Sequence, residues 1–561
     1  MSGLPLRSST FVIRHSHFVI LLDMWPIREV DEPAVARLTA EAGITNPMAR
    51  LLWLRGVRDA DAVHRWLAPE LGHLYPPELL PDFAPAVARI RKAIAGRETI
   101  LIWGHDDLDG ITSVVILYRL LTDLQAEVRY YIPQKGKERH GLNGELAAEL
   151  IGEDKGLVVT VDCGITNREP IAFLRSRGID VVVTDHHEVT ESLPESVASV
   201  DPKRSDSKYP YRGLAGAGVA LKLAMGIARE TLGLSVAEFI SVQPQQFAMA
   251  VLGTLADRVP LTGENRTIVA ASLGKLRAIP VPAVRAVFEY LNADEKLTVH
   301  RFVTELLPLF ATADGNEGVQ KFLTATLEEA RPWVAELAIR REEWQEQVQL
   351  TYELALKHLS VGDGIVFARD RDFNLRALGS CAMRLKERYQ LPAIVMGWRG
   401  DAWVGEGRGI EGASLMDLLS SCGRFFIDYG GHKKAAGFSM KDELVEEFVR
   451  CGEAYAHEHF AGRIRPENVV RADALLPLAD FDPALVGLAP FGEGNPQPVF
   501  ATGPTELMSA EDGWTVDGRP GLVLKPANPG IEIDTRLSYR LLYTLDDFGR
   551  LTILDVQSGE M

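Results

Sequence analysis

Three short clusters of carboxylate and imidazole side chains stand out in this sequence, because each directly follows a run of apolar residues. The clusters are His105-Asp106-Asp107-Leu108-Asp109, Asp162-Cys163-Gly164 and Asp185-His186-His187. In the first cluster His105, Asp107 and Asp109 alternate, so their side chains can surround more than one ion. Oxygen-rich ligand sets with one or two imidazoles favour Mn²⁺ or Mg²⁺. Two such ions about 3.5–4 Å apart share a carboxylate, activate a water and stabilise a leaving oxygen, which is the chemistry of phosphoester hydrolysis.

The apolar runs before the clusters predict the strands of a buried parallel sheet. Four short β-branched runs alternate with three segments of helical character, and such alternation indicates βαβ units. The runs are 100–103, 128–132, 157–161 and 181–184, and the helical segments are 113–123, 143–151 and 168–177. Ligands of open parallel sheets bind beyond the carboxyl ends of the strands, so we expect the three clusters to converge in space.

Each cluster also has a purely structural interpretation. An aspartate after a strand is usually a helix N-cap, a His-His pair is usually on the surface, and Cys163 is small enough to be a buried core residue. Asp201-Pro202 is interpreted as a turn. Three ligand-type clusters at three strand ends nevertheless favour a metal site over three separate structural roles.

Length and composition describe a globular protein of several domains, since 561 residues exceed the size of a single core. The net charge of −17 argues mildly against a nucleic-acid partner, which usually requires a basic surface. Acidic residues around a metal site can coexist with a local basic groove, so the objection is weak. The four cysteines show no paired spacing and indicate a reducing cytoplasm. No segment is predicted to span a membrane.

Four segments resemble the signature motifs of the DHH phosphoesterase superfamily. They are GHDDLDGITS (104–113), VDCGIT (161–166), TDHHEV (184–189) and LGTLADRVPLTGENR (252–266). Further segments are similar to the RecJ family of single-stranded-DNA exonucleases within it, in the same order along most of the chain. Among them are YPYRGLAGAGVALKL (209–223), GEGRGIEG (405–412), GGHKKAAGFS (430–439) and PFGEGNPQPVF (490–500). The resemblance starts near Trp25, which makes Met24 a candidate for the natural first residue and leaves residues 1–23 in question.

The resemblance implies a fold of mixed α/β class. It comprises an N-terminal helical region (1–95), a DHH-type parallel-sheet domain (96–325), a long connecting helix (326–357), a smaller DHH-associated α/β domain (358–463) and a C-terminal OB-like β-barrel (464–561).

The resemblance also implies the roles of individual residues. The ligands of two Mn²⁺ or Mg²⁺ ions would be His105, Asp107, Asp109, Asp162, His186 and Asp257. Asp162 would bridge the ions, and His187 would contact the scissile phosphate or assist the leaving group. Nucleic acid would be held by Lys135, Arg408, Gly430, Gly431 and His432. Asp257 can alternatively be a helix-associated acid, Lys135 a solvated loop residue and the two glycines a turn.

The activity that the resemblance implies is 5′-to-3′ degradation of single-stranded DNA to 5′-mononucleotides, in DNA repair and recombination. A single-stranded-DNA-binding protein and a RecQ-type helicase are the expected partners of a cytoplasmic monomer. One alternative is a DHH phosphodiesterase that cleaves short oligoribonucleotides or cyclic dinucleotides. Another is a non-catalytic replication scaffold, which should have lost its metal ligands.

The chain departs from the RecJ pattern at several positions. His105 stands where the family more often has Asp, and Lys135 and His140 stand where it usually has Arg and Tyr. A Trp-His-x-Gly signature is missing near 373–379, and the stretch 521–526 is a short strand region. We therefore expect an altered metal preference and differences in how the strand is bound.

Overall fold

A computed structural model of the chain describes residues 25–558, apart from several short segments. These segments are 135–137, 139–140, 153–155, 190–191, 294–297, 432, 463–469, 520 and 529–530. Lys135, His140 and His432 therefore lie outside the described residues.

A five-stranded parallel sheet carries the three ligand clusters at the carboxyl ends of its strands. Its spatial order is β2-β1-β3-β4-β5, with every neighbouring pair parallel. The strands are β1 (Thr99–Trp103), β2 (Val128–Tyr131), β3 (Gly156–Val161), β4 (Asp180–Thr184) and β5 (Ala198–Val200). The four predicted strands are confirmed, whereas the three-residue β5 was not predicted.

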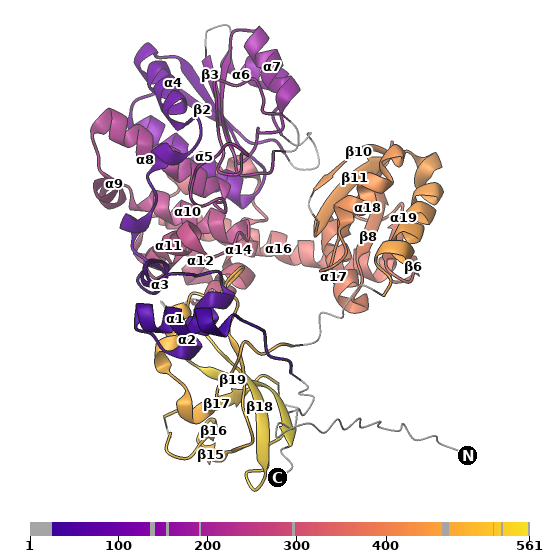
Figure 1. Ribbon diagram of the computed structural model, residues 1–561. Helices are drawn as coiled ribbons and strands as arrows, with labels where there is room; N and C mark the ends of the chain where they lie inside the picture. Colours follow the sequence, from indigo (N-terminus) through magenta and orange to yellow (C-terminus); the bar gives the residue numbers. More distant parts are fainter. Residues whose placement is uncertain are drawn as a thin grey trace.

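Helices cover both faces of this sheet, which explains why β1 and β3 consist of buried residues throughout (Figure 1). Successive side chains of a strand point to opposite faces. Ile100 and Ile102 accordingly pack in one core with α5 and α8, while Leu101 and Trp103 pack in another with α6 and α7. The covering helices are α4 (Phe83–Gly96), α5 (Leu108–Asp123), α6 (Gly144–Ile151), α7 (Arg168–Ser176) and α8 (Gly216–Leu232).

A helical layer follows the sheet and packs against α5 and α8. Its elements are α9 (Val236–Val242), α10 (Pro244–Ala256), α11 (Gly263–Ser272), η3 (Leu273–Ala278), α12 (Pro282–Tyr290), α13 (Val299–Arg301), η4 (Phe302–Leu306), α14 (Leu307–Phe310) and α15 (Gly315–Thr324). Among the described residues no single helix has the length and apolarity needed to cross a membrane, although the bent pair 263–278 and 282–290 meets the test by length and composition.

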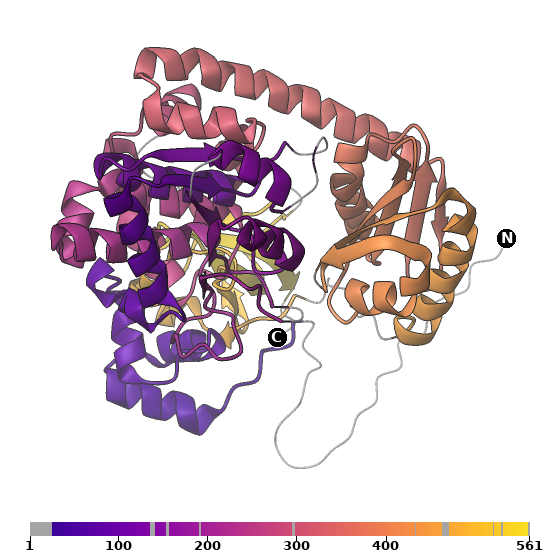
Figure 2. The same ribbon diagram turned by 90° about the horizontal axis from the view of Figure 1, so that it is seen from above.

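The predicted long helix is confirmed as α16 (Leu327–Ala355), which begins at a capping box formed by Thr326 and Glu329. It bridges the first sheet and its helices to a second α/β unit (Figure 2). The sheet of that unit has the order β10-β11-β9-β8-β7-β6, and only β7 and β8 are parallel.

In its described residues the second unit contains six strands, three α-helices and three short 3₁₀ helices. Its strands are β6 (Leu359–Val361), β7 (Val366–Asp370), β8 (Ala393–Trp398), β9 (Trp403–Arg408), β10 (Phe426–Gly431) and β11 (Ala435–Met440). Its helices are η5 (Leu375–Ala377), α17 (Leu378–Tyr389), α18 (Leu415–Ser421), η6 (Gly423–Phe425), η7 (Asp442–Leu444) and α19 (Val445–His459).

The C-terminal part is a mixed sheet centred on the long antiparallel pair β18 and β19. Its elements are β12 (Ala474–Leu475), η8 (Leu478–Asp480), η9 (Pro483–Leu488), β13 (Val499–Ala501), β14 (Thr505–Glu506), β15 (Met508–Ala510), β16 (Gly513–Thr515), β17 (Leu524–Pro526), β18 (Ser538–Leu545) and β19 (Leu551–Ser558).

The first helices of the chain pack against this C-terminal sheet rather than against the parallel sheet (Figure 1). They are α1 (Glu32–Ala42), α2 (Asn46–Leu54) and α3 (Ala60–Leu67), followed by η1 (Leu71–His73) and η2 (Pro77–Leu79). Leu38 and Leu52 share one core with Leu485 and Tyr543. The indole Nε1 of Trp25 also donates to Asp555 at 3.1 Å. The two ends of the described chain therefore stabilise each other.

A buried arginine links these two ends to the helical layer. Arg266 of α11 is 2% exposed, and its guanidinium donates to four backbone carbonyls. One belongs to Trp66 in the last turn of α3, and three belong to residues 487–489 of the C-terminal part. A single side chain thereby connects three parts of the fold.

Replacing Arg266 with Met should keep most of its volume and remove all four hydrogen bonds. We expect a loss of stability of about 3 kcal/mol, because buried carbonyls are left unpaired. Urea denaturation, monitored by tryptophan fluorescence, measures this loss of stability. Arg277→Met, at an exposed position, is the control. Equal denaturation midpoints for the two variants would contradict the assigned role of Arg266.

Candidate metal centre

The first cluster follows β1 and is shaped by the start of α5. Asp107 is the N-cap of α5, where its Oδ1 accepts from the backbone N–H of Gly110 at 2.9 Å. Its Oδ2 lies 2.9 Å from Nδ1 of His105. A Cβ at position 110 would come within 2.3 Å of the carbonyl oxygen of His105, so this turn requires glycine. Asp107 thus fits both the structural and the metal-binding interpretation.

Asp109 is buried and points away from its own helix towards the N-terminus of α8. Its two carboxylate oxygens accept from the backbone N–H groups of Gly216 at 2.7 Å and Ala217 at 2.8 Å. The exposed N–H groups and the dipole at a helix N-terminus stabilise negative charge. α8 therefore fixes the direction in which this carboxylate faces.

Asp162 follows β3 and occupies the middle of the cluster. Its φ of 59° is in the left-handed region, which few residues other than glycine adopt. Its Oδ1 lies 3.1 Å from Nε2 of His186, and its Oδ2 lies 3.8 Å from Nδ1 of His105. Asp162 is 2% exposed, yet its Oδ1 makes no hydrogen bond with any residue that the structure describes. A buried carboxylate between two imidazoles is the expected arrangement for a bridging ligand.

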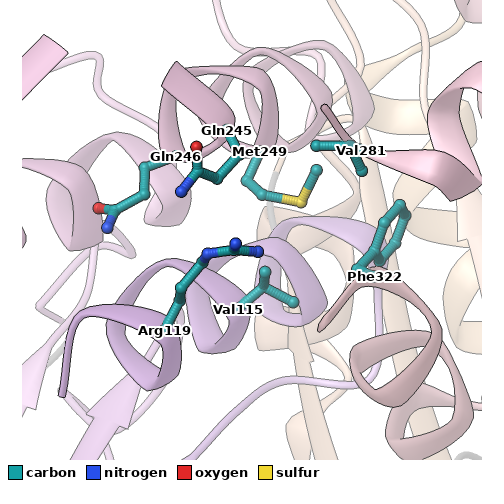
Figure 3. A pocket seen from close by; sticks show the side chains of 7 residues that line it. All are labelled: Val115, Arg119, Gln245, Gln246, Met249, Val281 and Phe322. Carbon is teal, nitrogen blue, oxygen red and sulfur yellow. The ribbon is translucent and has the colours of Figure 1, made fainter. Parts of the chain in front are cut away.

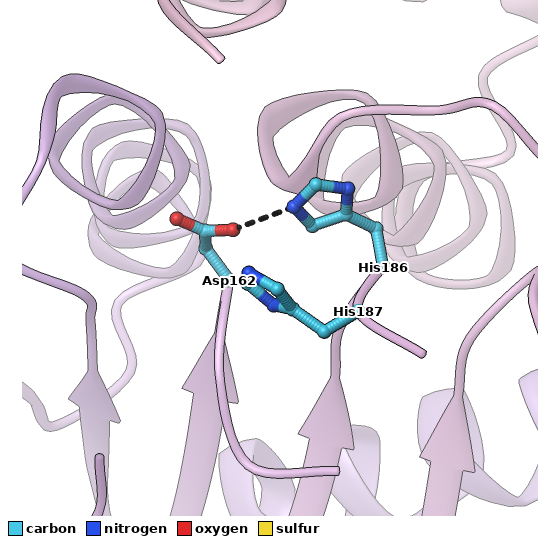
Figure 4. A group of neighbouring side chains, drawn as sticks. All are labelled: Asp162, His186 and His187. Carbon is cyan, nitrogen blue, oxygen red and sulfur yellow. Dashed lines mark ion pairs between the residues drawn. The ribbon is translucent and has the colours of Figure 1, made fainter. Parts of the chain in front are cut away.

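The Asp185-His186-His187 triplet divides into residues with different surroundings. Asp185 accepts from the backbone N–H groups of Ile165, His186 and His187 at 2.9, 2.7 and 3.1 Å. It also lies 2.7 Å from Nδ1 of His187. Figure 4 shows both histidines turned towards Asp162. Asp185 therefore orients His187 and leaves His186 facing the carboxylates.

Electrostatics separates the two histidines of the triplet. Burial lowers the pKa of His186 to about 3, so its imidazole is neutral and its Nε2 can accept a cation. Burial also opposes protonation of His187, but the hydrogen bond and charge of Asp185 outweigh it and raise the pKa of His187 to about 9. The cluster thus holds one neutral and one protonated imidazole at neutral pH.

Asp257 enters the cluster from the C-terminal end of α10, with its Oδ2 3.6 Å from Nε2 of His186. The seven side chains expected at the centre therefore converge. Ligand atoms within 4.8 Å of one another form three groups, which are His105/Asp107/Asp162, Asp109/His186/Asp257 and Asp162/His186/His187. The first two groups are separate sets of three donors, and Asp162 lies beside His186 of the second.

The negative charges of the cluster favour the binding of cations. Burial first, and then the charges of neighbouring carboxylates, raise the pKa of Asp109 and of Asp162 well above the usual range. Neither carboxylate pairs with a lysine or arginine in the described part of the chain. Carboxylate oxygens with two imidazoles form a donor set that fits Mn²⁺ or Mg²⁺.

Two glycines that the sequence did not single out as site residues shape the cluster. A Cβ on Gly216 would come within 2.6 Å of Oδ1 of Asp162, and a Cβ on Gly253 would come within 2.4 Å of Oδ1 of Asp109. They let α8 and α10 approach the buried carboxylates. The only sequence signal for this is the high content of small residues in GAGVALKL and in LGTLA.

Three of the five residues expected to bind nucleic acid, Arg408, Gly430 and Gly431, lie in the second sheet. Arg408 ends β9, where its Nη2 lies 3.2 Å from Glu406. Gly430 and Gly431 end β10, an edge strand, and the φ of 135° at Gly431 requires glycine. No hydrogen bond or ion pair joins these three residues to the metal cluster among the described residues. Lys135 and His432 lie outside the described residues.

A separate small cavity lies between α5 and α10 (Figure 3). Arg119 and Gln246 line it together with apolar side chains, and its volume is about 10 Å³. That is the space of about one water molecule. It is too small for a substrate and has no role in the metal centre.

Comparisons with known proteins place the chain in a family. The model of the DHH family, N-terminal domain, matches residues 99–252. The single-stranded-DNA-specific exonuclease RecJ of Dickeya dadantii is 30% identical over 499 residues, which cover 83% of this chain and 85% of the relative. The chain belongs to the RecJ family.

Other RecJ proteins agree with this assignment. RecJ of Bacillus subtilis is 28% identical over 491 residues, and the match spans only 61% of that longer relative. The crystal structure of Thermus thermophilus RecJ in complex with Mn²⁺ is 25% identical, with a TM-score of 0.77 over 96% of this chain and 80% of the other. The expected family and the expected α/β fold class, with its additional C-terminal sheet, are confirmed.

Replacing Gly253 with Ala should displace the carboxylate of Asp109, because the added methyl group would overlap its Oδ1. We expect Mn²⁺ affinity, measured by isothermal titration calorimetry, to fall by about tenfold or more, as when other groups that orient ligands are lost. Gly274→Ala is the control, since nothing lies within 4 Å of its added Cβ. Unchanged affinity in Gly253→Ala would show that α10 does not constrain Asp109.

Asp201 provides a test of the electrostatics next to the cluster. It directly follows β5, is fully buried, and accepts from the backbone N–H of Lys203 at 2.7 Å. Burial, and then the charge of Asp185, raise its pKa to about 7. The folded protein thus retains a proton that the unfolded chain releases near pH 4.

The stability contribution of Asp201 should therefore be present below about pH 4 and lost as pH rises to about 7. As pH rises across that window, the free energy of unfolding of Asp201→Asn should increase relative to that of the wild type by up to about 1.4 kcal/mol per pH unit. Urea denaturation at several pH values measures the difference. A difference that is independent of pH would contradict the raised pKa.

Proposed function

We propose that this RecJ-family protein is a metal-dependent exonuclease that degrades single-stranded DNA in the 5′-to-3′ direction and releases 5′-mononucleotides. The observation that carries the proposal is the convergence of ligand atoms from seven residues around buried carboxylates that pair with no lysine or arginine among the described residues. Family membership supports the substrate, because the relatives are named as single-stranded-DNA-specific exonucleases.

In this proposal His105, Asp107 and Asp162 would hold one ion, and Asp109, His186 and Asp257 the other, with Asp162 between them. Mn²⁺ or Mg²⁺ bound there would supply an activated water and neutralise charge on the transferring phosphoryl group. The protonated Nε2–H of His187 would donate to the scissile phosphate or to the leaving oxygen. Asp185 would keep that imidazolium charged and oriented.

The second sheet would contribute contacts to the DNA backbone. Arg408 would contact a phosphate, and the backbone N–H groups near Gly430 and Gly431 would form an anion-binding turn. Lys135 and His432 would complete this surface, as the family motifs imply. We further propose that the protein acts in the cytoplasm as a monomer, together with a single-stranded-DNA-binding protein and a RecQ-type helicase, as the resemblance to the family implies.

The competing functions predict different behaviour. A phosphodiesterase for short oligoribonucleotides or cyclic dinucleotides would not need the C-terminal sheet, yet the match to Thermus RecJ covers 96% of this chain, including that sheet. A non-catalytic scaffold should have lost ligands, whereas all six metal-ligand positions carry competent side chains. Both observations favour the polymer nuclease.

The direct test is digestion of single-stranded DNA labelled at either end, with Mn²⁺ or Mg²⁺ added. The 5′ label should appear at once as a mononucleotide, while the 3′ label should remain on gradually shortened strands. Asp162→Ala should reduce the rate by about a hundredfold or more, since it removes charge stabilisation from the reacting centre. Early release of the 3′ label would refute the polarity.

Two controls make that result specific. Asp201→Asn changes a buried aspartate at the end of the neighbouring strand without touching the proposed ligands, so it should retain activity. Labelled RNA and a labelled dinucleotide compare the alternative substrates under the same conditions. An inactive wild type with both metals would contradict the proposed function as a whole.

A further inference from the structure

A lysine and a glutamate form a buried ion pair outside the metal cluster. Lys222 of α8 is 0% exposed and Glu264 of α11 is 2% exposed, and their Nζ and Oε1 atoms lie 2.6 Å apart. The Nζ of Lys222 also donates to the carbonyl of Tyr75 at 2.7 Å. Glu264 accepts from the backbone N–H of Tyr75 at 2.7 Å and from the hydroxyl of Tyr209 at 2.6 Å. Both oxygens of Glu264 are therefore hydrogen-bonded.

Stability alone gives no reason for this pair. Two charges lose their hydration when they are buried, and apolar side chains of similar volume often replace such a pair without loss of stability. In some proteins a buried polar or charged group instead selects one of several similar packing arrangements. The elements that the pair joins here are α8 and α11, and each of them lies next to a metal-ligand residue.

α8 and α11 are connected to the two carboxylates of one ligand group. The N–H groups at the start of α8, at Gly216 and Ala217, donate to the carboxylate of Asp109. Lys222 lies less than two turns further along the same helix. α11 begins shortly after Asp257, at the end of a short connecting segment. The ion pair therefore joins the helix that orients one carboxylate to the segment that follows the other.

The connection between Asp257 and α11 turns sharply and is held by a second link. Arg258 has a φ of 55°, a left-handed conformation that persists only where the surrounding structure fixes it. Asn265 is fully buried in the first turn of α11. Its Nδ2 donates to the carbonyl of Pro260 at 3.1 Å and to the carbonyl of Gly213, just before α8, at 2.5 Å. Asn265 thus ties the turn after Asp257 to the start of α8.

We propose that Lys222, Glu264 and Asn265 are positioning residues for one of the two metal ions. They hold α8 and the start of α11 together, and they thereby fix the distance between the carboxylates of Asp109 and Asp257, which belong to one ligand group. The other ligand group comes from residues that follow β1 and β3, and it does not depend on this link. The inference rests on the proposed function, because it concerns the ions of that centre.

Variants that break the link without leaving a buried charge unpaired test the inference. Lys222→Met combined with Glu264→Gln removes both charges, and the glutamine retains an oxygen that can accept from the backbone N–H of Tyr75. Asn265→Ala removes the second link independently. Arg266→Met is the matched control, because it also loses buried hydrogen bonds of α11, but its partners lie in α3 and in the C-terminal part.

The measurement is the Kd of each Mn²⁺ ion, by isothermal titration calorimetry of the metal-free full-length protein, with urea denaturation to record stability. The wild type should bind two ions, and Asp257→Asn identifies the binding step of the ion concerned. The double variant and Asn265→Ala should each weaken that step by about tenfold or more, as when other groups that orient ligands are lost, and should leave the other step unchanged. Arg266→Met should leave both steps unchanged although it lowers stability.

Unchanged Kd values in the double variant and in Asn265→Ala would overturn the inference. An equal loss at both ions, or the same loss in Arg266→Met, would also overturn it, because the effect would then follow from general destabilisation. A wild type that binds no ion would contradict the proposed function as well. That outcome is distinct from two bound ions whose affinities the variants leave unchanged, which would contradict the positioning role alone.

Discussion

The carboxylates of Asp109 and Asp162 are buried next to other carboxylates. Much of the surrounding structure depends on this arrangement. Burying an ionised carboxylate without a partner is costly. The backbone N–H groups at the start of α8 offset that cost for Asp109, and no comparable donors reach Oδ1 of Asp162 among the described residues. A centre built in this way is stable in its ionised form only when cations bind there.

The packing around these carboxylates follows from the same constraint. α8 and α10 must lie close to the strand ends, and glycine at 216 and 253 is what permits it. Asp185 accepts three backbone N–H groups and can therefore remain ionised beside His187, which keeps a protonated group at the edge of a negatively charged cluster. The net charge of −17 is compatible with a DNA substrate, because part of the acidity is concentrated where metal ions bind.

The sequence predicted the parallel sheet and the convergence of the first three clusters because each cluster directly follows a β-branched run. β5 was not predicted because a strand of three residues is too short to show a recognisable hydrophobic pattern. Asp257 lies at the end of a helix, so only the family resemblance identified it. The roles of Gly216 and Gly253 depend on the close approach of α8 and α10, and the small residues around them do not identify which helix approaches which carboxylate.

The packing of the first helices against the C-terminal sheet could not be predicted from the sequence either. Contacts such as Trp25 with Asp555 join residues more than 500 positions apart, and neither partner differs in type from an ordinary core or surface residue. The sequence could thus identify site residues that directly follow strands. It could not identify residues whose role depends on backbone geometry or on packing between distant segments.

The central claim is that the buried carboxylates form a two-metal centre, and anomalous X-ray scattering from crystals grown with Mn²⁺ tests it most directly. We expect two manganese peaks about 3.5–4 Å apart on either side of Asp162, one contacting Asp107 and the other Asp109 and His186. A single peak, or peaks that do not contact Asp162, would contradict the account.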